Sequence, residues 1–166
     1  AQETIMAKAQ NILGLAFEDN RVVAAEVRVR PPHVHLARSG EFAIPEGLSS
    51  ADPSELGQQL RQFLKANHFS IKTAVVGLPA KWLVARELTI PPVATNALSG
   101  ILQIQAERAF ALDPNDLVFD YWGRTDSAKS SHVLLMAAHR ERINYISAMA
   151  KAAGLQLLAV TPTSHA

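Results

Sequence analysis

Apolar residues recur along this chain with two different periods. In short stretches they alternate with polar residues or form brief apolar runs between turn residues, and both patterns indicate strands. In longer stretches they recur every three or four residues, which indicates a helix with one buried face. The stretches predicted as strands are 12–18, 21–29, 33–44, 73–79, 83–91, 116–123, 132–139 and 155–162. The stretches predicted as helices are 53–67, 94–112 and 140–154.

The residues that flank the helical stretches support these limits. Ser50 or Asp52 can cap the first helix, Asp113-Pro114-Asn115 ends the second, and Gly154 ends the third. The predicted inner faces are Leu56, Leu60, Phe63 and Leu64; Leu98, Ile101, Leu102, Gln105 and Ala109; and Ile143, Ile146, Met149 and Ala150. The element order βββαβ, then βαββα, then β predicts an α/β or α+β protein with a second compact unit after the first.

Composition and charge restrict the class of protein. The chain has 166 residues, of which 48% are hydrophobic and 19% charged, and this suffices for one domain or two small ones. A net charge of +1 gives no sign of nucleic-acid binding, and the absence of cysteine excludes disulfides and thiolate metal sites. No apolar run approaches the roughly 18 residues that span a bilayer.

The two ends of the sequence suggest a fragment. Residues 1–10, "AQETIMAKAQ", are polar and do not begin with methionine, so we expect a disordered start or a tag remnant. The sequence stops at "TPTSHA", and we expect a strand truncated there from a longer protein.

Candidate chemistry is sparse. His33 and His35 share one side of a strand, but no further ligand completes a zinc site, so exposed strand histidines are the favoured interpretation and no metal is expected. No G-x-S-x-G nucleophile motif is present, and we predict no catalytic residue. The Gly-rich phosphate-binding motifs G-x-x-x-x-G-K-[ST] and G-x-G-x-x-G are also absent. Trp82, Tyr121 and Trp122 are either anchors for a partner or packing residues at the edge of the core.

Several segments in colinear order resemble one family. "AVVGLPAKWLVARELTIPP", "ILQIQAERAFALDPNDLVFDYWG" and "HVLLMAAHRERINYISAMAKAAGLQLLAVTPTSHA" are similar to segments of the actin-like ATPase superfamily. The resemblance is to the type IV pilus assembly protein PilM and its relatives, which include the cytoplasmic part of the type II secretion L protein and FtsA. It extends from about Ile12 to Ala166.

This resemblance implies the domain organisation. Residues 11–81 would form the actin/ribonuclease H-like subdomain 1A, a mixed sheet plus a helix, and residues 82–155 the inserted βαββα subdomain 1C, which is SHS2-like. Residues 156–166 would return to 1A as a strand. The second lobe of the family, which completes the nucleotide cleft, would be missing from this chain.

The family's first phosphate-binding hairpin corresponds to "GLAFEDNRVVAAEV", residues 14–27. Its apolar frame is kept from Gly14 onward, but Ala16, Glu18 and Val23 stand where the family has Asp, Gly and Lys. Glycine lets backbone amides approach a phosphate, and the carboxylates of Glu18 and Asp19, next to Asn20, would repel one. We therefore expect a degenerate hairpin and no bound cofactor in this chain, with ATP and magnesium doubtful even for a longer protein.

The resemblance implies a cytoplasmic scaffold, peripheral to the inner membrane, in a bacterial pilus or secretion assembly platform. Its partner would be the cytoplasmic tail of a PilN-like inner-membrane protein, and an assembly ATPase or a second copy are further candidates. The lining residues would come from the junction of 1A and 1C, namely Pro79, Lys81, Trp82 and Arg86. The alternatives are an active actin-fold ATPase or sugar-kinase-type enzyme whose second lobe lies elsewhere, and a stand-alone ligand-binding domain.

Overall fold

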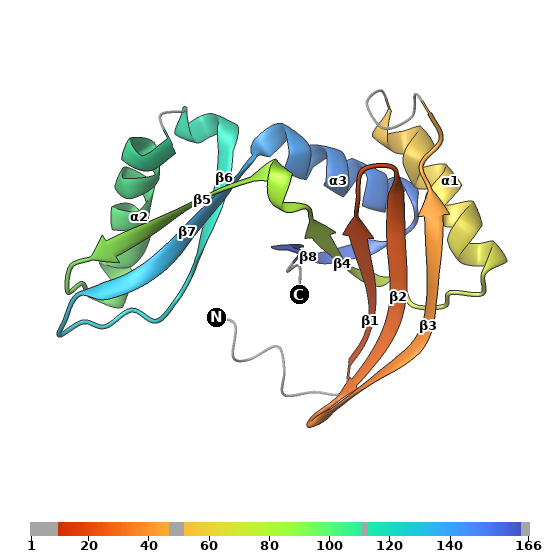
Figure 1. Ribbon diagram of the computed structural model, residues 1–166, viewed down its shortest axis with the longest axis horizontal. Helices are drawn as coiled ribbons and strands as arrows, with labels where there is room; N and C mark the ends of the chain where they lie inside the picture. Colours follow the sequence, from red (N-terminus) through yellow and green to blue (C-terminus); the bar gives the residue numbers. More distant parts are fainter. Residues whose placement is uncertain (1–9, 47–51, 111–112, 164–166) are drawn as a thin grey trace. The chain divides into compact units, whose positions relative to one another are not determined.

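The computed structural model describes residues 10–46, 52–110 and 113–163, and Figure 1 shows its elements. The chain divides into two compact units. Unit 1 comprises Ala1–Pro79 and Asn144–Ala166, and unit 2 comprises Ala80–Ile143. The element order predicted from the sequence is confirmed, with short 3-10 turns η2 (Ala80–Trp82) and η3 (Pro114–Asp116) added between strands and helices.

Unit 1 is a mixed five-stranded sheet with two helices. Its strands lie in the order β3-β2-β1-β4-β8, in which β2 is antiparallel to β1 and β3, and β4 is parallel to β1 and β8. The strands are β1 (Gln10–Phe17), β2 (Arg21–Arg30), β3 (His33–Ala43), β4 (Thr73–Leu78) and β8 (Gln156–Pro162). The helices are α1 (Pro53–Ala66) and α3 (Arg140–Ala152), and the residues of α3 from Asn144 onward belong to this unit.

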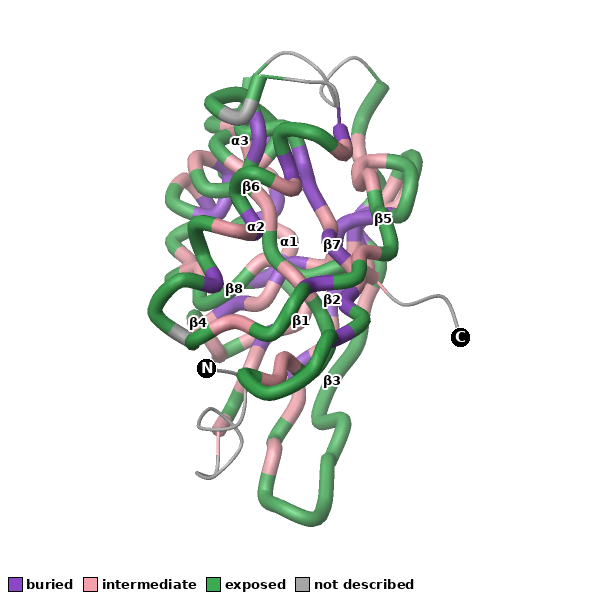
Figure 2. The backbone as a smooth tube through the Cα atoms, turned by 90° about the vertical axis from the view of Figure 1, so that its left-hand side faces the viewer, coloured by how far each residue is buried: buried purple, intermediate pink, exposed green. Residues whose placement is uncertain are grey.

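One face of this sheet forms the core of unit 1. Alternate residues of the three central strands are buried, and they are Leu13, Leu15, Phe17, Val22, Ala24, Ala74, Val76 and Leu78. Both helices lie on the same side of the sheet and contribute buried residues, namely Leu56, Leu60 and Leu64 from α1 and Ile146, Met149 and Ala150 from α3 (Figures 1 and 2). The other face of the sheet is lined by half-buried residues.

The helix ends follow the sequence signals. The side chain of Asp52 accepts a hydrogen bond from the backbone N–H of Ser54 at 2.8 Å, and Pro53 occupies the first turn of α1. Ser50 lies outside the described residues. Gly154 has φ +72°, a left-handed conformation that favours glycine directly after a helix.

Unit 2 is a three-stranded antiparallel sheet covered on one face by a helix. Its strands are β5 (Leu83–Ile90), β6 (Leu117–Trp122) and β7 (Ser131–His139), in the order β5-β7-β6, and its helix is α2 (Thr95–Phe110). The core joins α2 to one face of the sheet and consists of Ile90, Leu98, Leu102, Ala106, Phe110, Leu117, Val133, Leu135 and Ala137.

Three sequence-based expectations need correction. Gln10 is the first residue of β1 and pairs with Val29, so it is not part of a loose start; residues 1–9 lie outside the described chain. The second unit ends at Ile143 and not at 155, because most of α3 packs on α1 in unit 1. The buried face of α2 is centred on Ala106 and Phe110, whereas Gln105 is only half-buried.

No helix in the described part of the chain is both long and apolar enough to cross a membrane.

Candidate functional site: the β1–β2 hairpin and the open face of the second sheet

The β1–β2 hairpin forms as predicted, and its register shows where the altered positions lie. Ala16 of β1 is paired with Val23 of β2 on one side and with Gly77 of β4 on the other. Cross-strand partners point to the same face of a sheet, so these three residues form a row on the face opposite the helices. The positions where the family has Asp and Lys are therefore adjacent, and here they hold two apolar side chains.

The turn of the hairpin is held by backbone hydrogen bonds and by the side chain of Arg21. The backbone N–H of Glu18 donates to the carbonyl of Arg21 at 2.9 Å, and the carbonyl of Asn20 accepts from the N–H of Ile44 at 2.8 Å. The Arg21 guanidinium lies 2.5 Å from the carboxylate of Glu18 and 2.9 Å from that of Glu41. Hydrogen bonding and charge from Glu18, then the charge of Glu41, raise the pKa of Arg21 above its ordinary value.

These contacts bear on phosphate binding. Arg21 is the basic residue nearest the turn in sequence, and its guanidinium already faces two carboxylates. Gly14 has no positive φ, and a Cβ added there would lie 3.7 Å from the carbonyl of Ala25, which is ordinary contact. The guanidinium of the turn is therefore already engaged by carboxylates and is not available to an incoming phosphate. That this hairpin has lost its nucleotide remains a prediction.

The four residues predicted to bind a partner are divided between the two units, and their role in binding stays a prediction. Pro79 is buried in unit 1, whereas the other three belong to unit 2. Lys81 and Trp82 lie in η2, and the Arg142 guanidinium stacks 4.8 Å from the centre of the Trp82 ring. Arg86 is opposite buried Leu135 in the sheet, so it lies on the face that α2 covers, at an edge strand.

The other face of this sheet, the open face, is not covered by α2, and it carries Trp122, which the sequence offered as an anchor for a partner or as a packing residue. Its cross-strand rows are Glu87–Leu134–Trp122, Ala85–Met136–Asp120 and Leu83–Ala138–Val118. Trp122 is 66% exposed and Val118 is 36% exposed. An apolar face that carries an exposed Trp is typical of a protein-binding surface. The sequence signal was the alternation of "LVFDYW", which places Trp122 and Tyr121 on opposite faces.

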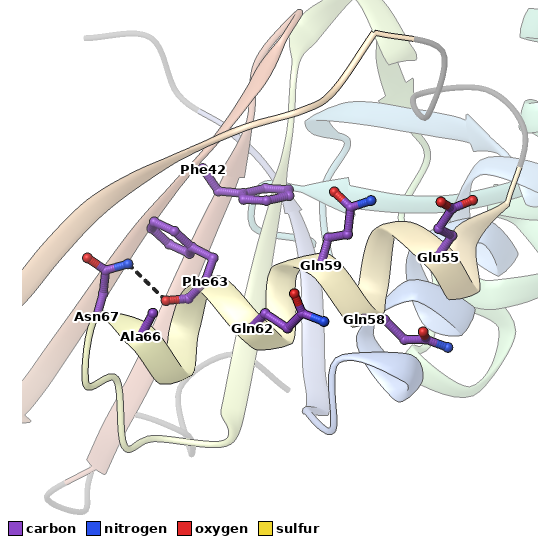
Figure 3. A pocket seen from close by; sticks show the side chains of 8 residues that line it. All are labelled: Phe42, Glu55, Gln58, Gln59, Gln62, Phe63, Ala66 and Asn67. Carbon is purple, nitrogen blue, oxygen red and sulfur yellow. Dashed lines mark hydrogen bonds between the residues drawn. The ribbon is translucent and has the colours of Figure 1, made fainter.

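A cavity of about 590 Å³ lies along α1 and contains none of the predicted site residues (Figure 3). The rings of Phe42 and Phe63 line one end, with centroids 5.5 Å apart, and glutamine side chains follow along the helix. The lining residues are Phe42, Glu55, Gln58, Gln59, Gln62, Phe63, Ala66 and Asn67. Its only charged group is the Glu55 carboxylate, so this cavity is unsuited to a phosphate.

Comparison with known proteins identifies solved structures with a similar fold. No protein-family model and no curated protein sequence matches the chain. Among solved structures, a type IV pilus biogenesis complex of PilM and PilN superposes with a TM-score of 0.81 at 20% identity, over 93% of this chain. The cytoplasmic domain of EpsL, an inner-membrane component of the type II secretion system of Vibrio cholerae, superposes with a TM-score of 0.61 at 18% identity, over 92% of this chain.

The chain has an actin-like fold. This agrees with the fold predicted from the sequence. The chain spans 48% of the PilM–PilN chain and 57% of the EpsL chain that it matches, so about half of each of those proteins has no counterpart here. The actin-like fold alone does not determine whether a protein binds a nucleotide or a partner.

Proposed function

We propose that this chain is part of an actin-like scaffold in a type IV pilus or type II secretion assembly platform. In this proposal the protein lies in the cytoplasm at the inner membrane and binds the cytoplasmic tail of a PilN-like membrane protein. The likeness to a PilM–PilN complex and to the EpsL cytoplasmic domain supports the kind of machine. The observation that carries partner binding is the open face of the β5-β7-β6 sheet, with Trp122 66% exposed.

The chemistry of the open face suggests what the tail contains. Leu134 and Met136 in the central strand are half-buried, and the exposed carboxylates of Glu87 and Asp120 flank them on the two outer strands. A segment with apolar residues and one or more Lys or Arg side chains would match this surface. Lys81 and Trp82, at the start of β5, remain predicted contributors.

The second candidate function is that of a nucleotide-binding enzyme, and only the actin-like fold supports it. The pairing of Ala16 with Val23 and the carboxylate pair around Arg21 disfavour it. We propose that the hairpin is a structural element of the scaffold. A D-x-G-x-[ST] hairpin in the remainder of a longer protein would favour the enzyme.

The experiment is affinity purification of the tagged full-length protein from detergent-solubilised membranes, followed by mass spectrometry. We expect a single-pass membrane protein encoded with pilus or secretion genes to co-purify, and to be lost with Trp122→Ser. Recovery of soluble metabolic enzymes alone would contradict the scaffold.

A further inference from the structure

The end of the β2–β3 hairpin has two chemically different faces. Arg28 is paired with His35, and Arg30 with His33, so four basic side chains share one face. The alternate pairs, Val27 with Leu36 and Val29 with Val34, share the opposite face. Successive residues of a strand point to opposite sides, so the hairpin is basic on one face and apolar on the other.

Both faces are accessible at the hairpin end. On the helix side of the sheet, Glu26 is the last buried residue of β2, with 4% of its surface exposed. Arg28 and Arg30, which follow on the same side of this strand, are exposed. On the opposite face Val34 is 68% and Leu36 58% exposed, the former being the most exposed large apolar side chain described. Figure 2 draws the hairpin end beyond the remaining strands, in the colour of exposed residues.

The basic charge is concentrated at the hairpin end. Residues 27–38 contain Arg28, Arg30 and Arg38 and no acidic residue, while the other residues carry 13 Lys or Arg and 15 Asp or Glu. The nearest carboxylate in sequence, Glu26, is buried and accepts hydrogen bonds from the backbone N–H and the hydroxyl of Ser70. Within the described part of the chain, Arg28, Arg30, His33 and His35 have no ion pair.

We propose that the β2–β3 hairpin end binds the surface of an anionic lipid bilayer. The hairpin would lie along the interface with Val34 and Leu36 in the boundary between headgroups and acyl chains. The long side chains of Arg28 and Arg30 would reach lipid phosphates from the basic face, with His33 and His35 beside them. A polar–apolar division of this kind is typical of elements that lie in the membrane interface, and the concentration of basic charge favours anionic lipid.

This inference does not rest on the proposed function, because it depends on the hairpin alone. A membrane fits both faces at once, since it offers phosphates and hydrocarbon within one interface. An acidic protein segment would match the basic face but would leave Val34 and Leu36 exposed. A segment of a longer chain packed on the apolar face would leave the four basic side chains unpaired. The peptide arm of the test below distinguishes an acidic protein segment from a membrane.

The test is flotation of the full chain with vesicles of phosphatidylcholine, with or without roughly a third of phosphatidylglycerol. We expect binding only to the anionic vesicles. Each basic side chain near an anionic surface strengthens binding about fivefold, so Arg28→Gln with Arg30→Gln should weaken it about 30-fold. Val34→Thr with Leu36→Thr should weaken it at least about tenfold, because buried apolar area is lost. The control pair Arg108→Gln and Arg124→Gln removes the same charge elsewhere and should bind normally.

Three results would overturn the proposal. The first is no binding to anionic vesicles. The second is equal loss in the control pair, which would indicate unspecific attraction. The third is unchanged binding by the Val34 and Leu36 variant, which would indicate that the apolar face does not enter the interface. If a poly-glutamate peptide bound through Arg28 and Arg30 while vesicles did not, the partner would be an acidic protein segment. All residues substituted in this test are exposed, so we expect the circular dichroism spectra of the variants to match that of the unchanged protein.

Discussion

At the scale of residues, two glycines of unit 1 have opposite roles. Gly57 lies where α1 packs tightly against α3: an added Cβ would be 2.4 Å from the carbonyl oxygen of Met149 and 2.6 Å from the Cβ of Ala152. Gly14 has room for a methyl group, although the family hairpin keeps a glycine there. Of these two glycines, packing therefore requires Gly57 and not Gly14. Gly57 lies within a helix, where the sequence shows neither a turn nor a phosphate-binding loop that would explain a glycine.

We expect Gly57→Ala to lower the free energy of unfolding by about 1–3 kcal/mol, because the helices must move apart. The control is Gly14→Ala, which should be neutral or raise stability by about 0.5 kcal/mol, since it restricts the unfolded chain without a clash. Urea denaturation followed by far-UV circular dichroism measures both. Equal stability of the two variants would show that the approach at Gly57 is not tight.

The hairpin residues lead to a second prediction at this scale. Titration of ATP with magnesium into the full-length protein should give no binding heat in the micromolar range, because Ala16 and Val23 cannot hold a metal or a phosphate and Arg21 is paired with Glu18 and Glu41. Magnesium-dependent micromolar binding in the calorimeter would mean that the hairpin is not degenerate.

At the scale of elements, the sequence predicted strands and helices to within a few residues, but not their neighbours. The apolar period of 140–154 predicts a helix with Ile146 and Met149 inside, and both are buried. The spacing of apolar residues does not determine which of the two sheets the helix packs on. The sequence therefore placed all of α3 in the second unit, whereas most of it belongs to unit 1. Likewise, "RVRPPHVHL" reads only as alternation until the register shows that Arg28 faces His35. Which side chains face one another depends on the register between two strands, and the sequence of one strand does not determine it.

The junction between α3 and β6 offers a prediction at this scale. The Arg140 guanidinium donates to the backbone carbonyls of Asn115 at 2.7 Å and Leu117 at 2.8 Å. Arg140→Ala should destabilise unit 2 by about 1–2 kcal/mol, since two carbonyls lose a charged donor at a partly exposed site. Both tryptophans, Trp82 and Trp122, lie in unit 2, so tryptophan fluorescence during urea unfolding reports on this unit.

The control for this prediction is Arg108→Ala, which removes an exposed basic side chain from α2. It should leave the fluorescence midpoint unchanged. If Arg140→Ala behaved in the same way, the two hydrogen bonds would contribute nothing to the stability of unit 2.

At the scale of the whole molecule, the actin-like fold followed from colinear segments and not from any one motif. Such a fold serves both nucleotide-binding enzymes and scaffolds, and the residues at the sites distinguish them. Two sets of residues favour a scaffold: the apolar row through Ala16 and Val23, and the open face with Trp122 and Met136. The first was visible in the sequence by comparison with the family hairpin. The second required the pairing of three strands.

Calorimetric titration of a peptide with the cytoplasmic tail of the PilN-like membrane protein, into the full-length protein, tests the central claim most directly. We predict micromolar binding that Trp122→Ser weakens by roughly 30-fold or more, as expected for a buried Trp anchor at an interface. The control variant Ile104→Ser alters another exposed apolar residue of unit 2, on α2, and should bind like the wild type. The absence of binding, or equal binding by the Trp122 variant, would contradict the account.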